Sequence, residues 1–336
     1  MSETAQRAGV LGGGNFITDY VKVITGWPEQ DTLATIQSES MSNGGGPYNV
    51  LKDLSKLVPG LRLEACGLVG DDLNGQWILE DCAAHGIDTG QLATTDRAST
   101  SYTDAMTVES DGRRTFFHQR GANALLAPGH FDFEQTNAKL FLLGYLMLLD
   151  TLDEWRGDGS TGAAEVLQAA RKSGLIAAVD CVSTPHLHFR EIALAAAQHA
   201  DLFLVNEYEI GQILGQEVAP ERGSMERAAL ELAEHAAGQV VLHAVSGAVV
   251  AERGRVLGAQ GSVNFPESQI VGATGAGDAF AAGYLLGVHQ DQPIDACLKF
   301  AVTSAAQSLT SGAPSEGMKS LATCLALLET HGERGF

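Results

Sequence analysis

The chain has 336 residues, of which 45% are hydrophobic and 18% charged, a balance that is typical of proteins with a large packed core and excludes a disordered chain. Lys and Arg number 21 against 41 Asp and Glu, which gives a formal net charge of −20. Such a charge opposes binding to nucleic acid or to a membrane surface, although a few backbone N–H groups can still bind a small anion.

Apolar segments alternate with helix-like segments along most of the chain. Near-continuous apolar strands between helices are typical of a parallel sheet that helices cover on both faces. We therefore predict an α/β fold with a central, mostly parallel sheet flanked by helices on both faces. The expected strands are 9–13, 63–69, 139–149, 175–180, 202–205 and 239–242, and the expected helices are 73–85, 162–172, 191–199, 225–237, 276–288, 293–309 and 316–329.

Two segments, 16–40 and 94–119, break this alternation. They are rich in Thr, Val, Tyr and Phe, and Asp111-Gly112 lies between two strand-like runs, which predicts a β-hairpin. We expect the two segments to form a small β-sheet lid on an α/β core. That core would comprise residues 1–15, 41–93 and 120–336. Because open sheet edges tend to pair with other strands, we also expect a homodimer formed through the lid.

The cysteines and the lengths of the apolar stretches indicate in which cell compartment the protein is expected. The five cysteines are odd in number and include no CxxC pair, so neither a disulfide framework nor a zinc ribbon is expected. The longest apolar stretch, 140–149, is too short to cross a bilayer, and the N-terminal residues lack a signal-peptide pattern. We expect a cytoplasmic protein.

The segment 272–280, GATGAGDAF, carries the strongest chemical signal. Gly275, Ala276 and Gly277 stand at the start of an apolar helix, where backbone N–H groups and the helix dipole together form an anion site. Asp278 falls in the first turn. A carboxylate beside a bound anion is explained by general-base work, namely taking a proton from a hydroxyl that attacks phosphorus. The structural alternative is a glycine-rich helix start with a favourable first-turn acid.

This segment resembles the DTxGAGD signature of the ribokinase-like (PfkB) family of carbohydrate kinases. Further motifs of that family follow in its order: GNFITD at 14–19, GGGPYN at 44–49, GLVGDDLNG at 67–75, GID at 86–88, NEYE at 206–209 and a helix that ends in GA at 313. The resemblance implies a ribokinase-like α/β fold with a β lid. It also implies ATP and Mg²⁺ as cofactors, and transfer of the γ-phosphoryl group to a hydroxyl of a small-molecule sugar.

The resemblance carries roles to individual residues. Asp278 matches the catalytic base, and residues 275–277 match the anion hole. Glu209 matches a position that binds Mg²⁺ through water, although Asn206 and Glu209 are equally explained as the N-cap and the third residue of a helix. The substrate-binding positions are Asp19, Gly44, Gly45 and Asn49, and the nucleotide-binding positions are Asn206, Gly247, Gly275 and Gly277.

The chain departs from the family pattern at two places. Gly272 and Ala273 stand where the family has Asp-Thr, so the sequence does not decide whether the protein binds a monovalent cation. In the strand before Gly247, Leu242 and Ala244 replace the Thr and first Gly of T-x-G-x-x-G, which leaves the strength of ATP binding open.

Two alternatives therefore remain beside a sugar kinase. One is a nucleoside kinase, in which the nucleobase of the substrate would pack on aromatic side chains of the lid. The other is a ribokinase-like binding or regulatory protein with impaired ATP use, against which the retained Asp278 argues. On the lid, His118 and Arg120 are either substrate contacts or ordinary surface.

Overall fold

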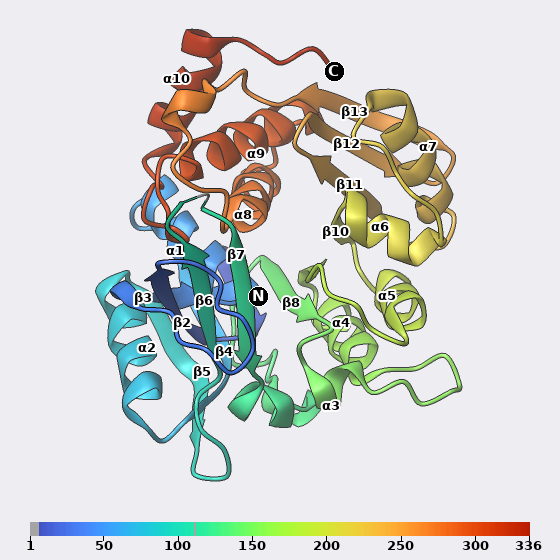
Figure 1. Cartoon of the computed structure of the whole chain (residues 1–336). Coiled ribbons are helices and arrows are strands. Elements are labelled where there is room, and N and C mark those ends of the chain that lie inside the picture. Colours follow the sequence, from blue (N-terminus) through green and yellow to red (C-terminus); the bar gives the residue numbers. More distant parts are fainter. Residues whose placement is uncertain (1–6, 111) are drawn as a thin grey trace.

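The computed structural model describes residues 7–110 and 112–336, and nine strands of this part form one large sheet (Figure 1). Its order is β13-β12-β11-β10-β9-β8-β1-β4-β5, with parallel pairs from β5 to β11 and antiparallel pairs from β11 to β13. The predicted mostly parallel sheet is confirmed. The strands are Val10–Gly14 (β1), Leu63–Gly70 (β4), Ile87–Thr95 (β5), Leu140–Leu146 (β8), Ile176–Cys181 (β9), Leu202–Asn206 (β10), Gln239–Ala244 (β11), Gly247–Glu252 (β12) and Arg255–Gly261 (β13).

Helices cover both faces of this sheet, each over its own buried cluster. Along β8, Leu140 and Leu142 pack on one layer while Phe141 and Leu143 pack on the other, which is why this strand is apolar throughout. The first layer contains α1 (Gly46–Leu57), α2 (Leu73–Ala84), α8 (Ala276–His289) and α9 (Ile294–Ser308), with α10 (Leu321–His331) packed on α9. The second contains α4 (Gly162–Lys172), α5 (Phe189–Ala197), α6 (Glu207–Leu214) and α7 (Arg222–Ala233), and the short α3 (Asp150–Asp153) lies beside α4.

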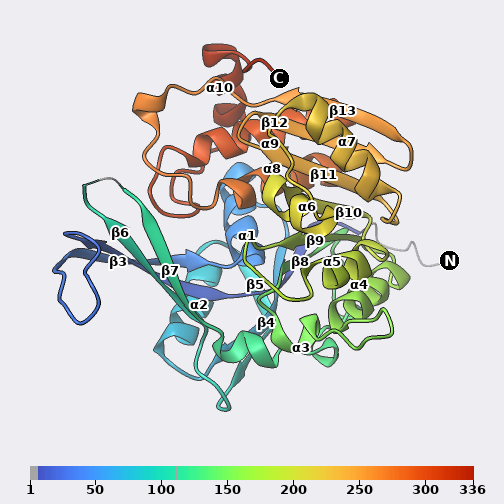
Figure 2. The same cartoon turned by 45° about the vertical axis from the view of Figure 1, so that its right-hand side comes forward.

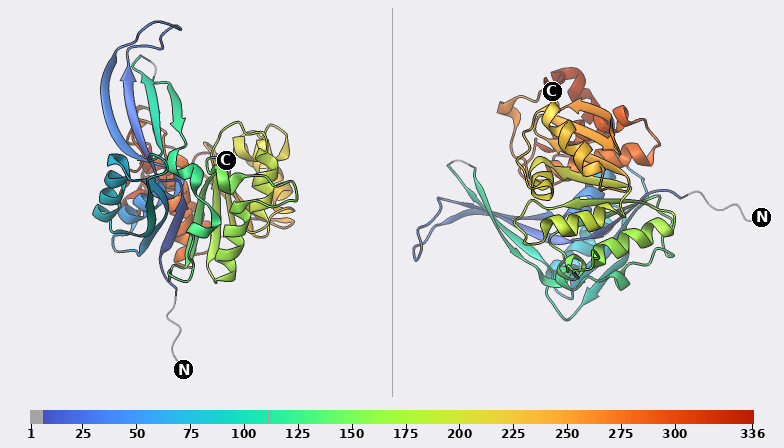
Figure 3. Two further views of the ribbon diagram at one scale, coloured as in Figure 1. Left: turned by 90° about the horizontal axis from the view of Figure 1, so that it is seen from below. Right: turned by 90° about the vertical axis from the view of Figure 1, so that its right-hand side faces the viewer.

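A second, smaller sheet projects from the core (Figures 2 and 3). Its order in the described residues is β3 (Ile36–Gly44), β2 (Ile17–Ile24), β6 (Tyr102–Val108) and β7 (Arg114–Gln119). The predicted β6–β7 hairpin is confirmed by antiparallel pairing, although Asp111 of its turn lies outside the described residues. β3 continues to Gly44, past the expected end of the lid segment at 40. The division into core and lid at the expected boundaries stays a prediction.

One predicted helix starts later than expected. The segment 316–329 was expected to be helical, but α10 begins at Leu321, because the Ser320 side chain accepts the Thr323 N–H as an N-cap. The residues before it form a loop that returns to α1, where Lys56 Nζ donates to the Ser315 carbonyl at 2.8 Å. This loop therefore belongs to the surroundings of the α8 N-terminus.

Two observations concern the whole described chain. All five cysteines are buried free thiols. None of the helices in residues 7–110 and 112–336 is long and apolar enough to cross a membrane.

Candidate active site

Two cavities meet at the N-terminus of α8, where the parallel strands end. The first, which we call the lid cavity, has a volume of about 460 Å³ and lies between the small sheet and the ends of β8, β9 and β10. The second, the hairpin cavity, has about 320 Å³ and lies between the β11–β12 hairpin, α8 and α9. Residues common to both linings are Asn206, His243, Ala273, Ala276 and Gly277. A crevice at the carboxyl ends of parallel strands is the usual ligand site of such sheets.

Asp278 lies in the first turn of α8 and lines the lid cavity with only 5% exposure. The Tyr145 hydroxyl donates to its Oδ1 at 2.6 Å, and Asn49 Nδ2 donates to its Oδ2 at 2.8 Å. Burial raises the pKa of Asp278 to about 6, while the hydrogen bonds from Tyr145 and Asn49 oppose this rise. The carboxylate is thus held by two donors and titrates just below neutral pH, where a general base is effective.

The predicted anion hole forms the start of the same helix. Gly275 is the N-cap and has φ +82°, a left-handed conformation that favours glycine. The first N–H groups of a helix have no partner within it, so the amides at this end face the cavities. The Ala276 N–H is engaged within the loop, where it donates to Ala273 O at 3.2 Å. The amide of Gly277 lies beside His243, whose Cε1 would be 3.5 Å from a Cβ at that glycine.

Asp19 is brought to the other side of the lid cavity by β2. The sheet register places it in one row with Thr103 and His118, so all three side chains face the cavity. Burial raises the pKa of Asp19 to about 7, a hydrogen bond from Thr103 lowers it, and the Asp278 charge raises it further. A Cβ at Gly44 would lie 2.4 Å from Asp19 Oδ1, so a side chain at 44 would displace this carboxylate.

The remaining predicted substrate positions, Gly45 and Asn49, also line the lid cavity. Gly45 is the N-cap of α1, and Asn49 lies one turn into that helix. Both hydrogen-bonding ends of the Asn49 amide already have protein partners, since its Oδ1 accepts from Asn43 at 2.7 Å and its Nδ2 donates to Asp278. The structure therefore brings Asp19, Gly45, Asn49 and Asp278 together around one cavity.

The two lid residues considered in the sequence are separated by the structure. His118 lines the lid cavity, with Nδ1 at 3.1 Å from Thr103 Oγ1 and a buried Nε2 that has no hydrogen-bond partner. Burial, and secondarily the charge of Arg120, lower the pKa of His118 to about 4, so the ring is neutral. Arg120 itself donates to Met147 O at 2.9 Å and lies outside the lid-cavity lining.

Asn206 and Glu209 form a reciprocal capping box at the start of α6. Asn206 Oδ1 accepts the Glu209 N–H at 2.9 Å, and Glu209 Oε2 accepts the Asn206 N–H at 2.9 Å. The capping interpretation is thus confirmed, and the same two side chains also line the lid cavity. Burial raises the pKa of Glu209 to about 7.

A fourth carboxyl group, Asp180, was not singled out from the sequence. It is the last residue but one of the apolar strand β9, as Asn206 is the last of β10, so a search for polar residues at strand ends would also have found it. Burial raises the pKa of Asp180 well above its usual value, and the charges of Glu209 and Asp278 raise it further. The lid cavity therefore contains the four acids Asp19, Asp180, Glu209 and Asp278, and none of its described lining residues is Lys or Arg.

In the hairpin cavity, the two departures from the nucleotide motif lie differently. Leu242 is fully buried in the hydrophobic core and lies outside the cavity lining, and its correspondence to the Thr of the motif stays a prediction. Because successive strand side chains face opposite sides, His243 faces the cavity while Leu242 faces the core, and Ala244, the last residue of β11, joins the lining together with Gly247. His243 stacks on Phe280 with ring centroids 4.7 Å apart, and burial lowers its pKa to about 4.

The small sheet also reaches the loop before the anion hole. Arg114 of β7 donates to the Thr274 hydroxyl and to Gly312 O, the latter at 3.0 Å. A Cβ at Gly272 would lie 3.3 Å from Arg114 Nη2, so the guanidinium occupies the space into which a longer side chain at 272 would extend. No local sequence signal could have paired residues so far apart.

Comparison with known proteins agrees with this geometry. The chain is 26% identical to the ATP-dependent ribose-1-phosphate kinase of Halopiger xanaduensis over 97% of this chain and 98% of that protein. It is 24% identical to the 5-dehydro-2-deoxygluconokinase of Shouchella clausii over 85% and 86% of the two chains. The structure of Arabidopsis thaliana ribokinase complexed with ribose and ATP has the same fold, with a TM-score of 0.78, 19% identity and coverage of 96% and 99%.

The family itself follows from a match that covers nearly the whole chain. The model of the pfkB family carbohydrate kinases matches residues 14–321. This range contains every acid and glycine that lines the two cavities. The predicted family, enzyme class and ribokinase-like fold are therefore confirmed, and the chain belongs to the pfkB family of carbohydrate kinases.

Proposed function

We propose that this kinase transfers the γ-phosphoryl group of ATP to a hydroxyl of an uncharged sugar, with Asp278 as the general base. The observation that carries the proposal is the position of Asp278, a buried carboxylate at the α8 N-terminus where the two cavities meet. A donor in one cavity and an acceptor in the other would place the transferred group beside this carboxylate and the helix N–H groups.

The hairpin cavity suits a nucleotide. Its wall is largely apolar and includes Val263, Phe265 and Leu309, which fits a flat base. Its inner end carries Asn206 and the α8 N-terminus, which fits phosphates because unpaired N–H groups and the helix dipole favour anions. Bound ATP supplies the phosphoryl group, and Gly247, Gly275 and Gly277 let the backbone approach it closely.

The lid cavity suits an uncharged polyhydroxyl acceptor. Its four carboxyl groups can bind hydroxyls, while a phosphate or carboxylate on the acceptor would meet negative charge without a Lys or Arg in the described lining to offset it. The Halopiger relative is named for a phosphorylated sugar. We therefore propose that this chain differs from that relative in the charge of its acceptor, with Asp19 and Asn49 contacting the substrate hydroxyls.

A magnesium ion that arrives with the nucleotide would find carboxyl groups at this place. The charges of Glu209 and Asp278 raise the pKa of Asp180, and a divalent cation would offset this negative charge. Among the described residues no three acidic, His or Cys side chains are grouped closely enough to hold a metal by themselves, so the phosphates and water would supply most of its ligands. Both Glu209 oxygens already accept hydrogen bonds, so Glu209 would hold the ion through water. Mg²⁺ supplies charge neutralisation on the phosphates when bound. For a monovalent cation the residues do not fit, because Gly272 lacks a carboxylate and Arg114 occupies the adjoining space.

The proton of the acceptor hydroxyl would pass to Asp278. Tyr145 and Asn49 keep both carboxylate oxygens in place, and the small sheet covers the cavity so that water is excluded during transfer. A nucleoside remains the second candidate acceptor, because Phe116 of β7 also lines the cavity and offers a ring for a base.

The test is an ADP-release assay with ATP and Mg²⁺ across neutral sugars, sugar phosphates, sugar acids and nucleosides. We expect turnover with neutral sugars and at least a hundredfold lower kcat/KM for anionic ones, about 3 kcal/mol. Turnover confined to anionic acceptors would contradict the charge argument. Failure of any nucleotide to bind would favour the binding or regulatory alternative.

Two earlier expectations stay predictions, the cytoplasmic location and a homodimer through the lid. For the dimer, Trp27 and Phe117 stack at 6.0 Å on the outer face of the small sheet and are 52% exposed each. An exposed aromatic pair beside sheet edges suits a second copy of the same face. Sedimentation velocity of the wild type and of Trp27→Ser tests this, and a monomeric wild type would contradict it.

A further inference from the structure

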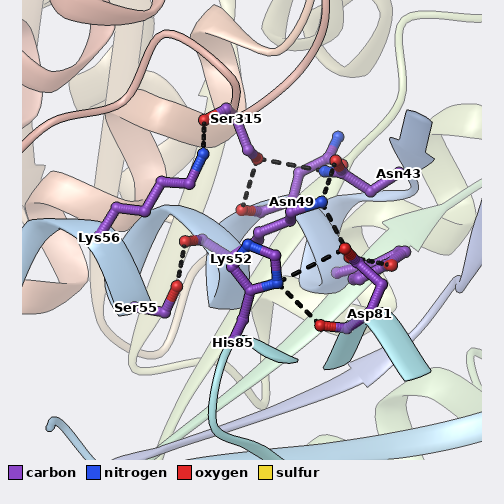
Figure 4. Close-up of polar contacts among 9 residues, drawn as sticks. Asn43, Asn49, Lys52, Ser55, Lys56, Asp81, His85 and Ser315 are labelled. Carbon is purple, nitrogen blue, oxygen red and sulfur yellow. Dashed lines mark hydrogen bonds and ion pairs between the residues drawn. The ribbon is translucent and has the colours of Figure 1, made fainter. Parts of the chain in front are cut away.

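A line of polar side chains leads from Asp81 of α2 through Lys52 and Asn43 to Asn49 (Figure 4), and Asn49 contacts the proposed base. Lys52 Nζ donates to Asn43 Oδ1 at 3.0 Å, Asn43 Nδ2 donates to Asn49 Oδ1 at 2.7 Å, and Asn49 Nδ2 donates to Asp278 Oδ2 at 2.8 Å. We call Lys52, Asn43 and Asn49 the amide relay. Asn43 and Asn49 are buried, and the Lys52 side chain is 12% exposed.

The Lys52 ammonium group determines which way the amide groups of Asn43 and Asn49 are turned. An ammonium group has donors and no acceptor, so Asn43 must turn its oxygen toward Lys52 and its NH₂ group away. That NH₂ group meets Asn49 Oδ1 and, at 3.2 Å, Ser315 Oγ. Asn49 must then turn its own NH₂ group toward Asp278. An ionised Asp278 requires the same orientation of Asn49, whereas a protonated Asp278 could donate to an Asn49 oxygen, so Lys52 favours the orientation that suits the ionised base.

The Lys52 ammonium is itself anchored. It forms an ion pair with Asp81 of α2 at 2.8 Å. The Tyr48 hydroxyl donates to Asp81 Oδ2 at 2.5 Å, and His85 Nδ1 lies 3.5 Å from Asp81 Oδ1. Lys52 is therefore fixed by groups that lie outside both cavities.

We propose that Lys52 and Asn43 are positioning residues, which keep Asn49 as a hydrogen-bond donor to Asp278 and so keep that carboxylate ionised and aimed at the acceptor. The proposal rests on the proposed function, since it assigns a purpose to the Asp278 geometry. Asn49 acts directly on the base, while Lys52 and Asn43 act through it.

The expected signature is a change in pH dependence. The side chains around Asp278 come from five elements besides α8: Asn49 and Asp53 from α1, Tyr145 from β8, Asp19 from β2, Asp180 from β9 and His243 from β11. Burial raises the pKa of Asp278, and the hydrogen bonds from Tyr145 and Asn49 lower it, so that it lies at about 6. A flipped Asn49 would present oxygen to the carboxylate, so this pKa would rise and the base would be protonated over a wider range of pH.

The experiment compares Lys52→Met and Asn43→Asp with the wild type. Asn43→Asp has the same shape and still accepts from Lys52, but it offers an acceptor to Asn49 and so drives the flip. For both variants we expect the acidic midpoint of kcat, at saturating acceptor, to move up by about one pH unit, which lowers kcat about fivefold at pH 6 and little at pH 8.5. The affinity for ATP, measured by titration calorimetry, should change less than about twofold.

Two controls for Lys52→Met separate the effect of amide orientation from the effect of losing a positive charge. Lys56→Met removes an equal charge from the same helix, but Lys56 donates to the Ser315 carbonyl and to no amide oxygen of the relay, so its midpoint should not move. Lys52→Arg keeps a group with donors alone and should restore the wild-type midpoint.

The outcomes distinguish this proposal from the proposed function. A loss of kcat that is equal at pH 6 and pH 8.5, or an equal shift in Lys56→Met, would overturn the relay while leaving the kinase intact. A wild type without phosphoryl transfer would overturn the function itself, and a fully active Asp278→Asn would remove Asp278 as its base.

Discussion

Replacing Asp278 by Asn keeps the shape of the side chain and removes its charge, and we expect two opposite consequences. The amide oxygen can accept from Asn49 as before, and the new NH₂ group faces the Tyr145 hydroxyl, which can accept a hydrogen bond after rotating. Both cavities should therefore keep their form, and ATP and acceptor should bind nearly as in the wild type. Without a base, kcat should fall by about 10²–10⁴-fold.

The same substitution should raise the free energy of unfolding while it lowers kcat. Asp278 has a pKa of about 6 in the folded protein against an ordinary value of 3.8, so the folded state binds this proton more tightly than the unfolded state does. Stability contributed by the protonated form is therefore lost as pH rises from 3.8 through about 6. A difference of about two pKa units corresponds to about 3 kcal/mol, so Asp278→Asn should raise the free energy of unfolding by up to that amount at pH 8. At pH 4 the gain should vanish.

The assays are steady-state kinetics, calorimetric titration of ATP and acceptor, and urea unfolding at pH 4 and pH 8. Wild type at both pH values is the control for any general effect of pH on the fold. A kcat within a few-fold of wild type would remove Asp278 from the mechanism. A stability change of the same size at both pH values would refute the argument that an ionised carboxylate is held at a cost.

Further outcomes are expected from other residues. Asp19→Ala should raise KM for the acceptor and leave KM for ATP almost unchanged, and the reverse pattern would contradict its placement in the lid cavity. His243→Ala should weaken ATP binding about fivefold to tenfold, roughly 1 kcal/mol, whereas Leu242→Ala should cost about 2–5 kcal/mol of stability with ATP affinity unchanged, as calorimetry and urea unfolding can decide. The rate in potassium should equal the rate in tetramethylammonium at the same ionic strength, and strong potassium activation would show that Arg114 does not occupy a cation position.

The parts of the fold that were predictable are those set by local pattern. Apolar runs and helix signals place β8, α4 and β10 correctly, because their side chains alternate between two buried layers or repeat at helical spacing. The start of α10 was missed because Ser320 is an N-cap five residues into the expected helix, and capping depends on one side chain rather than on a period.

The site was predictable where motif and strand end coincide. Asp278, Asn206 and Asp19 were found because each follows a recognisable glycine-rich or apolar segment. In the hairpin cavity, the motif pointed to Leu242 and Ala244, whereas the lining contains His243 beside Ala244 and Gly247, because strand alternation turns the Leu242 side chain into the core. Lys52 and Arg114 could not be found, since their partners come from distant segments.

The pairing of β7 with β6 decides which side chains of β7 reach the lid cavity. Phe116 lines the lid cavity and Phe117 stacks on Trp27 on the outer face, because neighbouring strand residues point to opposite sides. A shift of one residue in the pairing of β7 with β6 would exchange the two faces of the strand. Related sequences should therefore vary in length in the turn between β6 and β7, which lies outside this pairing, rather than within β7.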